Sequence, residues 1–246
     1  MRPDATTAIL ETRGIEMRFN SLVVLNGIDF KLGADEAVGI IGPNGAGKTT
    51  FLSTLVGAHM PTAGTIRFRD DDITFLPAPE RSRIGLIRTH QIPRPFTGMT
   101  VLENALVAAT HGGGLRGHAA YERALDALDF CGMTGLANRR AETLGLLDRK
   151  RLELVRSLAT NPAVLLLDEI GGGLTDREAG ELVDMIKALR SRAIAIVWIE
   201  HIVHILLQVV ERLICLDAGR IIADGTPDTV MKDPDVVRAY LGGAVQ

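Results

Sequence analysis

Alternating apolar and polar residues run through the first part of the chain and predict β-structure there. Residues 9–32 alternate in short stretches broken by Gly14, Asn20 and Gly27, a pattern typical of antiparallel strands joined by turns. The stretch 65–74 has the same character and predicts another hairpin at a sheet edge. Together these residues indicate an antiparallel β edge.

Three later runs are continuously apolar, as expected of strands that are covered on both faces of a parallel sheet. They are residues 37–41, 164–167 and 193–199. A final hairpin is predicted in residues 212–225. The core is therefore expected to be a mainly parallel sheet.

Helical signals fill the middle of the chain. Thr100 and Glu103 have the spacing of a capping box at the start of a helix. Two further segments have residues at helical spacing, namely Tyr121, Leu125 and Leu128 in the first and Leu147, Arg151, Leu154 and Leu158 in the second. The glycine-rich stretch 111–118 between the helices predicts a mobile loop, and its histidines lack metal-site partners.

Alternation of helix and strand returns after residue 162. Thr175 and Glu178 form another capping-box pattern, and residues 202–210 have a helical pattern. The predicted fold class is α/β, with a parallel helix-covered sheet and a β edge in about residues 8–90 and 162–225. A helical piece of about residues 91–161 is inserted, and residues 226–246 form a helical tail.

Composition narrows the class of protein. The formal net charge is −3, which argues against general nucleic-acid binding because a phosphate backbone requires a basic face. The first residues have no long apolar core, and the run 193–199 is too short to span a membrane, so we expect a cytosolic chain. Cys131 and Cys215 are expected to be buried and unpaired.

The pattern G-x-x-x-x-G-K-[ST] occurs in GPNGAGKTT, directly after the first buried strand. Glycines let successive backbone N–H groups surround phosphate oxygens, and the next helix adds partial positive charge. Lys48 can neutralise the outer phosphates, and the Thr49 hydroxyl is a hard oxygen ligand that suits Mg²⁺. The predicted phosphate-binding residues are Gly42, Pro43, Asn44, Gly45, Ala46, Gly47, Lys48, Thr49 and Thr50.

Two acidic residues end the second buried strand. Asp168 can hold Mg²⁺, and Glu169 can orient or deprotonate a water that attacks the γ-phosphate. His201 follows the third buried strand, where it can contact the γ-phosphate or the water, although a lone histidine at a strand end is more often structural.

In this order the motifs resemble the ABC-transporter ATPase family over nearly the whole chain. The resemblance implies that Phe19 stacks on adenine, that Gln91 is the Q-loop glutamine and that His201 is the switch histidine. The implied ligands are ATP and Mg²⁺. The implied metal-binding residues are Thr49, Gln91 and Asp168, and the implied catalytic residues are Glu169, His201 and Gln91.

Residues 88–109 and 233–243 resemble the branch of this family that imports branched-chain and other hydrophobic amino acids. The resemblance implies a peripheral subunit on the cytoplasmic face of the inner membrane. Its partners would be a second ATPase, two membrane-spanning permease subunits and, indirectly, an external substrate-binding protein. Residues 91–100 would meet the permease, with Phe96 as an apolar anchor or, alternatively, as packing for the helical piece.

One motif departs from the family pattern. The signature Leu-Ser-Gly-Gly-Gln is replaced by LGLLD, residues 144–148, in which Leu147 replaces a glycine and Asp148 adds negative charge. Thr175 also stands where many members have an aspartate. We therefore hypothesise an asymmetric heterodimer in which the partner supplies the working signature, although a homodimer stays possible because the helix N-terminus after LGLLD still offers N–H groups.

Other functions are compatible with part of the pattern. A kinase fits the phosphate loop alone, and ABC proteins that act on nucleic acid or ribosomes generally carry tandem cassettes, coiled-coil inserts or basic extensions. A nucleotide-dependent clamp with little hydrolysis stays open because of LGLLD. The chain carries no feature that selects the transported solute.

Overall fold

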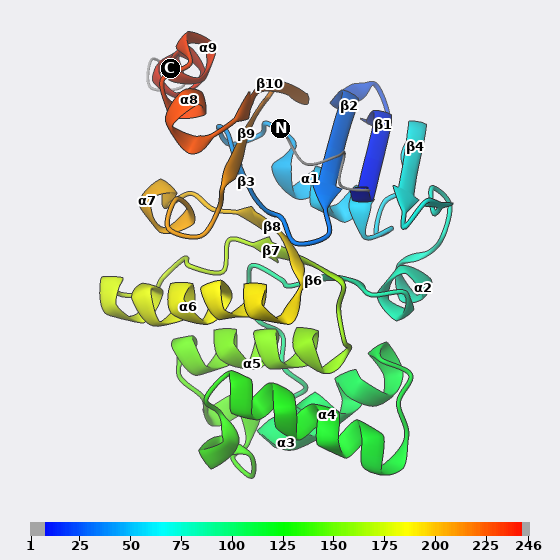
Figure 1. The fold of residues 1–246 in the computed structure, drawn as a ribbon, viewed down its shortest axis with the longest axis vertical. Helices are drawn as coiled ribbons and strands as arrows, with labels where there is room; N and C mark the ends of the chain where they lie inside the picture. Colours follow the sequence, from blue (N-terminus) through cyan, green and yellow to red (C-terminus); the bar gives the residue numbers. More distant parts are fainter. Residues whose placement is uncertain (1–7, 243–246) are drawn as a thin grey trace, which may run out of the picture.

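The computed structural model describes residues 8–242, which form two sheets and the helices around them (Figure 1). The smaller sheet has the order β2-β1-β4-β5, and the larger has the order β10-β9-β3-β8-β7-β6. In the larger sheet only the β9–β10 pair is antiparallel. The predicted α/β fold with a mainly parallel sheet and an antiparallel edge is confirmed.

The antiparallel sheet is built on two long strands, β1 (Ala8–Phe19) and β2 (Leu22–Gly33), completed by β4 (Ala63–Phe68) and β5 (Asp71–Asp72). The chain turns between β1 and β2 at Asn20, as predicted. The turns predicted at Gly14 and Gly27 are wrong, because both glycines lie inside the strands at breaks in the β1–β2 register. Their positive φ values of 59° and 74° are typical of bulges.

The strands of the larger sheet form the centre of the hydrophobic core. The strands of this sheet are β3 (Ala37–Ile41), β6 (Leu86–Arg88), β7 (Val164–Asp168), β8 (Ala195–Ile199), β9 (Arg212–Asp217) and β10 (Arg220–Gly225). Every residue of β3, β7 and β8 is buried, as predicted for strands covered on both faces. Along β7, Leu165 and Leu167 face one apolar cluster, and Val164 and Leu166 face the other.

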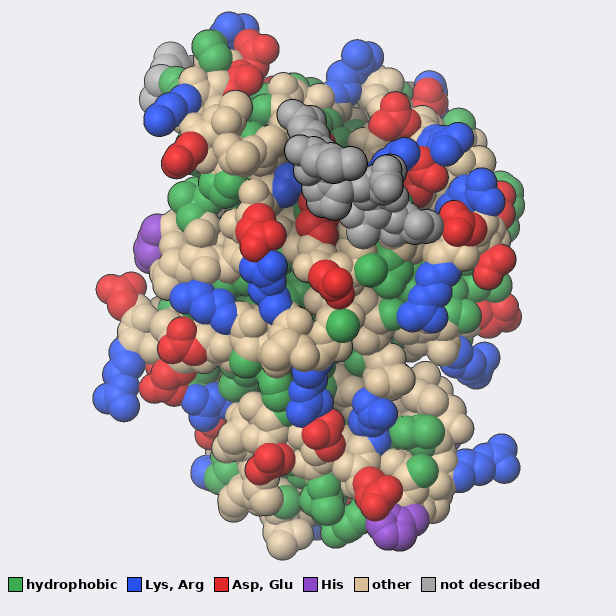
Figure 2. Space-filling model, in the orientation of Figure 1, with side chains coloured by type: hydrophobic (Ala, Val, Ile, Leu, Met, Phe, Trp, Pro, Cys, Tyr) green, Lys and Arg blue, Asp and Glu red, His purple; other side chains and the backbone are tan. Residues whose placement is uncertain are grey.

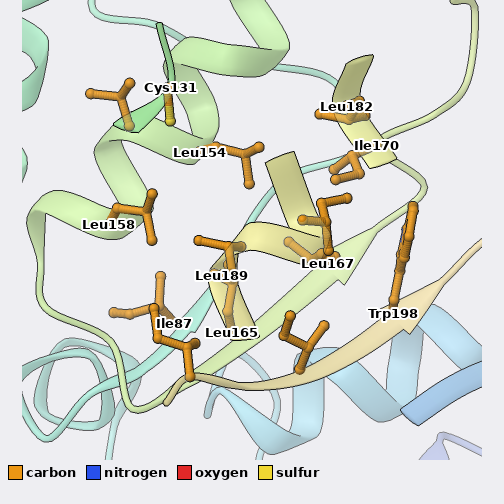
Figure 3. Packing of buried hydrophobic residues seen from close by; sticks show 14 of the residues in the cluster. Ile87, Cys131, Leu154, Leu158, Leu165, Leu167, Ile170, Leu182, Leu189 and Trp198 are labelled. Atoms are coloured by element: carbon orange, nitrogen blue, oxygen red, sulfur yellow. The ribbon is translucent and has the colours of Figure 1, made fainter. Parts of the chain in front are cut away.

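Helices cover the two faces of this sheet. On one face α1 (Lys48–Leu55) contributes Phe51 and Leu52 to the core. On the other, α6 (Asp176–Leu189) and α5 (Leu146–Ala159) pack side by side (Figure 1). Figure 3 shows Leu154 of α5, Leu189 of α6 and Trp198 of β8 around this second face, so the inserted helices share a core with the sheet.

The inserted helical piece consists of α3 (Val101–Val107), α4 (Gly117–Phe130) and α5, and it forms the lower end of the molecule in Figure 1. The capping box predicted at Thr100 and Glu103 is present. The expected loop 111–118 is wrong at both ends, because residues Ala108–Gly112 form a π-helical turn and α4 already begins at Gly117. Small alanines rather than Tyr121, which is exposed, line the buried face of α4.

Short helices complete the chain. They are α2 (Ala78–Arg83), α7 (Val203–Leu206), α8 (Pro227–Met231) and α9 (Pro234–Gly242). Only four residues of the stretch 202–210 are helical, so the long helix expected there is wrong. The predicted tail helices are present, and residues 243–246 of the tail lie outside the described residues.

Cys131 and Cys215 are both buried and free, as predicted. Within residues 8–242 no helix is long and apolar enough to cross a membrane, and no group of acidic, histidine and cysteine side chains forms a metal cluster. Lysine and arginine side chains are interspersed with acidic ones over the face shown in Figure 2.

The packing of α5 gives a stability prediction. Leu154 is 1% exposed in the core that joins the helical piece to the sheet, so Leu154→Ala should lower the free energy of unfolding by about 2–5 kcal/mol. Leu146→Ala on the same helix removes a side chain that is 45% exposed and should change it by less than about 0.5 kcal/mol. Chemical denaturation of both variants measures the difference, and equal values would contradict the assigned packing.

Candidate functional site

The phosphate loop connects β3 to α1 and depends on its glycines. A Cβ on Gly42, at φ 145°, would lie 2.0 Å from the carbonyl oxygen of Leu216. A Cβ on Gly47, at φ 102°, would lie 2.8 Å from the carbonyl oxygen of Val24. The loop therefore fits between β2 and β9 only with glycine at these positions.

Lys48 lies at the start of α1 and is folded onto the loop. Its ammonium donates to the carbonyl oxygens of Gly42, at 2.7 Å, and Pro43, at 2.9 Å. Burial lowers the pKa of Lys48, whereas the negative charges of Glu169 and Asp168 act in the opposite direction. The structure thus brings the loop lysine and the two predicted carboxylates into one electrostatic site.

Asp168 ends β7 with its two carboxylate oxygens in different surroundings. Its Oδ2 accepts a hydrogen bond from Arg88 at 2.5 Å, whereas Oδ1 is buried without a partner in the described residues. Arg88 also donates to the hydroxyl of Ser53 on α1, at 2.7 Å. One guanidinium thus connects β6, β7 and the helix that follows the phosphate loop.

Glu169 follows Asp168 and brings the three predicted catalytic residues together. Its Oε1 lies 2.8 Å from Nε2 of His201, and its Oε2 accepts a hydrogen bond from the side-chain amide of Gln91. The contact with His201 is a hydrogen bond when Nε2 carries the proton. Glu169 has φ 49°, a left-handed conformation that is uncommon outside glycine and often occurs at functional sites.

The other predicted phosphate-site residues surround Lys48. Asn44, Gly45 and Thr49 are exposed, whereas Ala46 is buried. Phe19 lies at the end of β1, is 40% exposed and contacts His59 edge to face, with ring centroids 5.3 Å apart. The exposed faces of Phe19 and Thr49 leave both side chains accessible to a ligand.

The LGLLD segment begins α5. Gly145 is the N-cap, and Leu146 is exposed beside Gly173, whose Cβ would lie 3.2 Å from its side chain. Leu146 also helps to line a cavity of about 270 Å³ that includes Gln91 and Glu169. The charge of Asp148 is partly compensated by Arg151, at 3.6 Å.

Thr175 has a structural role. Its hydroxyl accepts from the N–H of Glu178 and the side chain of Glu178 returns to the N–H of Thr175, which completes the predicted capping box of α6. Thr175 therefore stabilises the helix start at the position where the family pattern has an aspartate.

Glu200 is a further site residue that the sequence patterns do not reveal. It is 2% exposed, and its Oε1 accepts from the N–H of Gly171 at 2.5 Å. Burial raises the pKa of Glu200. Burial lowers the pKa of Lys150, and the negative charge of Glu200 acts in the opposite direction on it. Glu200 thereby connects the loop after Glu169 to the segment that carries His201.

Arg88 and Glu200 were missed for the same reason. Each is one charged residue at the end of a strand, and its role depends on neighbours that are distant in sequence. The available signal was closeness in sequence to a predicted functional residue, because Glu200 directly precedes His201 and Arg88 lies three residues before Gln91.

The fold and site together define a class of protein. A glycine loop and its lysine after one parallel strand, with a pair of carboxylates at the end of another, are the parts of a phosphate-loop nucleotide hydrolase. Residues 25–171 match the family model described as "ABC transporter", and residues 220–246 match the model "Branched-chain amino acid ATP-binding cassette transporter". The chain belongs to the ABC-transporter ATP-binding family, whose members are the nucleotide-binding ATPase subunits of transporters.

Relatives and solved structures agree with this assignment. The chain is 38% identical to the high-affinity branched-chain amino acid transport ATP-binding protein LivG of Escherichia coli K12, over 96% of this chain and 98% of LivG. It is 37% identical to BraF of Pseudomonas aeruginosa, with the same coverage. A crystal structure of an ATP-binding cassette in its ADP conformation has a TM-score of 0.88 and 30% identity, over 96% of this chain and 100% of the other.

The hydrogen bond between Glu200 and Gly171 predicts a loss of stability in Gly171→Ala, for which the neighbouring residue Gly172 provides a control. A Cβ on Gly171 would lie 2.8 Å from Oε1 of Glu200, whereas a Cβ on Gly172 meets its nearest atom at 3.6 Å. Gly171→Ala should break the buried hydrogen bond and lower the free energy of unfolding by about 1–3 kcal/mol. Gly172→Ala should change it by less than about 0.5 kcal/mol. Thermal or chemical denaturation compares them, and a neutral Gly171→Ala would contradict a fixed Glu200.

Proposed function

We propose that the chain binds ATP with Mg²⁺ and hydrolyses it to drive the import of branched-chain or other hydrophobic amino acids, or of related small solutes. The observation that carries this proposal is the convergence of Lys48, Asp168 and Glu169 at one edge of the sheet. The similarity to LivG and BraF over nearly the full chain supports the class of solute.

The residues at this edge fit a nucleotide and its metal. The phosphates would lie over the loop from Gly42 to Thr50, and Phe19 would stack on the adenine. The unpartnered Oδ1 of Asp168 and the exposed hydroxyl of Thr49, with Gln91, are the oxygen donors that would hold Mg²⁺. When bound, Mg²⁺ neutralises charge on the β- and γ-phosphates.

The surroundings of Glu169 suit a residue that directs water. His201 and Gln91 each engage one carboxylate oxygen, which fixes the plane of the carboxylate. Each oxygen keeps a further lone pair that can accept a hydrogen bond from water. Glu169 would orient and deprotonate the water that attacks the γ-phosphate, with His201 beside it as the switch histidine and Gln91 as the Q-loop glutamine.

The LGLLD segment supports pairing with a different ATPase. In a head-to-tail pair this segment faces the partner's nucleotide, and Leu147 with Asp148 replaces the glycine and glutamine of the family signature. Arg151 offsets part of the charge of Asp148, whereas nothing in residues 8–242 offsets the bulk of Leu146 and Leu147 at the helix start. A heterodimer with an intact partner signature is favoured, and a homodimer is the alternative.

A groove between the sheet and the helical piece suits the permease. A cavity of about 250 Å³ is lined by Phe96, His111 and Arg156, among others. Arg156 lies over the ring of Phe96, 4.7 Å from its centroid, and the ring is partly exposed. One membrane-spanning subunit would dock here, and a second would dock on the partner ATPase, which would place the chain at the cytoplasmic face of the inner membrane. The two permease subunits would receive solute from an external binding protein.

The replacement of the family signature by LGLLD is also compatible with a second function. A nucleotide-dependent clamp, which closes on a partner with little hydrolysis of its own, is favoured by the exposed Leu146 and by Asp148 in LGLLD. Phosphate release measured with the partner ATPase present separates the two functions, because the clamp would release little phosphate.

Replacing Glu169 tests its role in hydrolysis. Glu169→Gln should keep ATP binding and lower steady-state phosphate release by about a hundredfold or more, the usual contribution of a general base. Glu122→Gln, on the exposed surface of α4, is the matched control and should hydrolyse like the wild type. Equal turnover in Glu169→Gln and wild type would remove Glu169 from this role.

Mixing experiments test the asymmetric pair. The purified chain alone should hydrolyse ATP slowly, and activity should rise when a partner ATPase of the same family with an intact signature is added. The double variant Leu147→Gly, Asp148→Gln should be at least about tenfold faster alone, because contacts with the γ-phosphate act in a water-excluded site. Rapid hydrolysis by the wild-type chain alone, unchanged in the double variant, would favour a homodimer with a working LGLLD segment.

A further inference from the structure

The tail helix α9 contacts the phosphate loop through one side chain. The hydroxyl oxygen of Tyr240 accepts a hydrogen bond from the N–H of Gly42, at 2.9 Å, across 198 positions of sequence. Gly42 belongs to the region matched by the ABC transporter model, and Tyr240 belongs to the separately matched residues 220–246. The contact therefore joins the nucleotide-binding core to the tail.

Gly42 is buried and closely packed. Its φ of 145° and the approach of the Leu216 carbonyl leave no room for a side chain. Its carbonyl oxygen accepts from Lys48, and its N–H donates to Tyr240. Both polar groups of the first residue of the loop are thus held, one by the loop's own lysine and one by the tail.

The position of α9 supports the hydrogen bond between Tyr240 and Gly42. Helix α9 contacts α8 and β10. Val236 is 2% exposed and lies four residues before Tyr240, so the two side chains share one face of α9, although the Tyr240 residue as a whole is 42% exposed. The helix start is stabilised by Asp233, whose carboxylate accepts from the N–H of Asp235 at 2.8 Å. Burial raises the pKa of Tyr240, so its oxygen is a neutral acceptor at physiological pH.

We propose that Tyr240 is a positioning residue for the nucleotide site and that it couples the docking of α9 to nucleotide binding. The inference rests on the proposed ATP site at residues 42–50. A loop whose first peptide is already held loses less conformational freedom when its N–H groups bind phosphate. By linkage, bound nucleotide must strengthen the docking of α9 by the same factor.

The test removes only the hydroxyl. Tyr240→Phe should raise the dissociation constants of ADP and ATP about three- to tenfold, the scale of one lost neutral hydrogen bond. The kcat at saturating ATP, measured with the partner ATPase present, should stay at the wild-type value. Tyr121→Phe is the matched control, since the chain has two tyrosines and Tyr121 is exposed on α4. A fluorescent ribose-labelled ADP gives the affinities, and thermal melting gives the stability of each variant.

Amide hydrogen exchange measures whether bound nucleotide strengthens the docking of α9. ADP should slow amide exchange in residues 235–240 of the wild type, and this slowing should be lost in Tyr240→Phe. A Tyr240→Phe variant that melts earlier but binds ADP like the wild type would overturn the inference and leave the nucleotide site intact. If the wild-type chain fails to bind the labelled ADP, the nucleotide site and the inference are both wrong.

Discussion

The arrangement of the site depends on one constraint, namely that parallel strands present their carboxyl ends at the same edge of a sheet. β3, β8 and β7 are hydrogen-bonded neighbours in that order. The phosphate loop leaves β3, the pair Asp168–Glu169 leaves β7, and His201 follows β8. Residues far apart in sequence therefore meet because the strands run in one direction, and the buried apolar side chains of these strands hold that direction fixed.

The local patterns determined what could be predicted. The buried strands, the capping boxes at Thr100 and Thr175, and the glycine loop depend on neighbouring residues, so the sequence predicts them well. Predictions were wrong where one sequence pattern is compatible with two local structures. Gly14 and Gly27 permit either a turn or a bulge, and the long pairing of β1 with β2 selects the bulge. In α4 the buried residues are Ala120, Ala124, Ala127 and Leu128, so Leu128 is buried as predicted and Tyr121 is exposed.

The polar contacts of the site join residues that are distant in sequence, so local patterns do not predict most of them. Glu169 and His201 were expected near the γ-phosphate from their positions at strand ends, whereas Gln91 was expected there only from the resemblance to a family. The structure places Gln91 and His201 on the two carboxylate oxygens of Glu169. Arg88 and Glu200 had no motif to mark them. Each compensates for burial at a place that exists only after folding, Arg88 beside Asp168 and Glu200 beside Gly171. Such partners cannot be derived from spacing along the chain, because they depend on which strands become neighbours.

The position of Trp198 has a consequence for observing this protein in solution. It is the only tryptophan in the sequence, it is fully buried, and it lies on β8 three residues before His201 (Figure 3). Its indole therefore emits from an apolar environment at a single location, next to Glu200 and the segment that carries His201. Tryptophan fluorescence of the unlabelled chain therefore reports on β8, the strand that leads to His201, because no other tryptophan contributes to the emission.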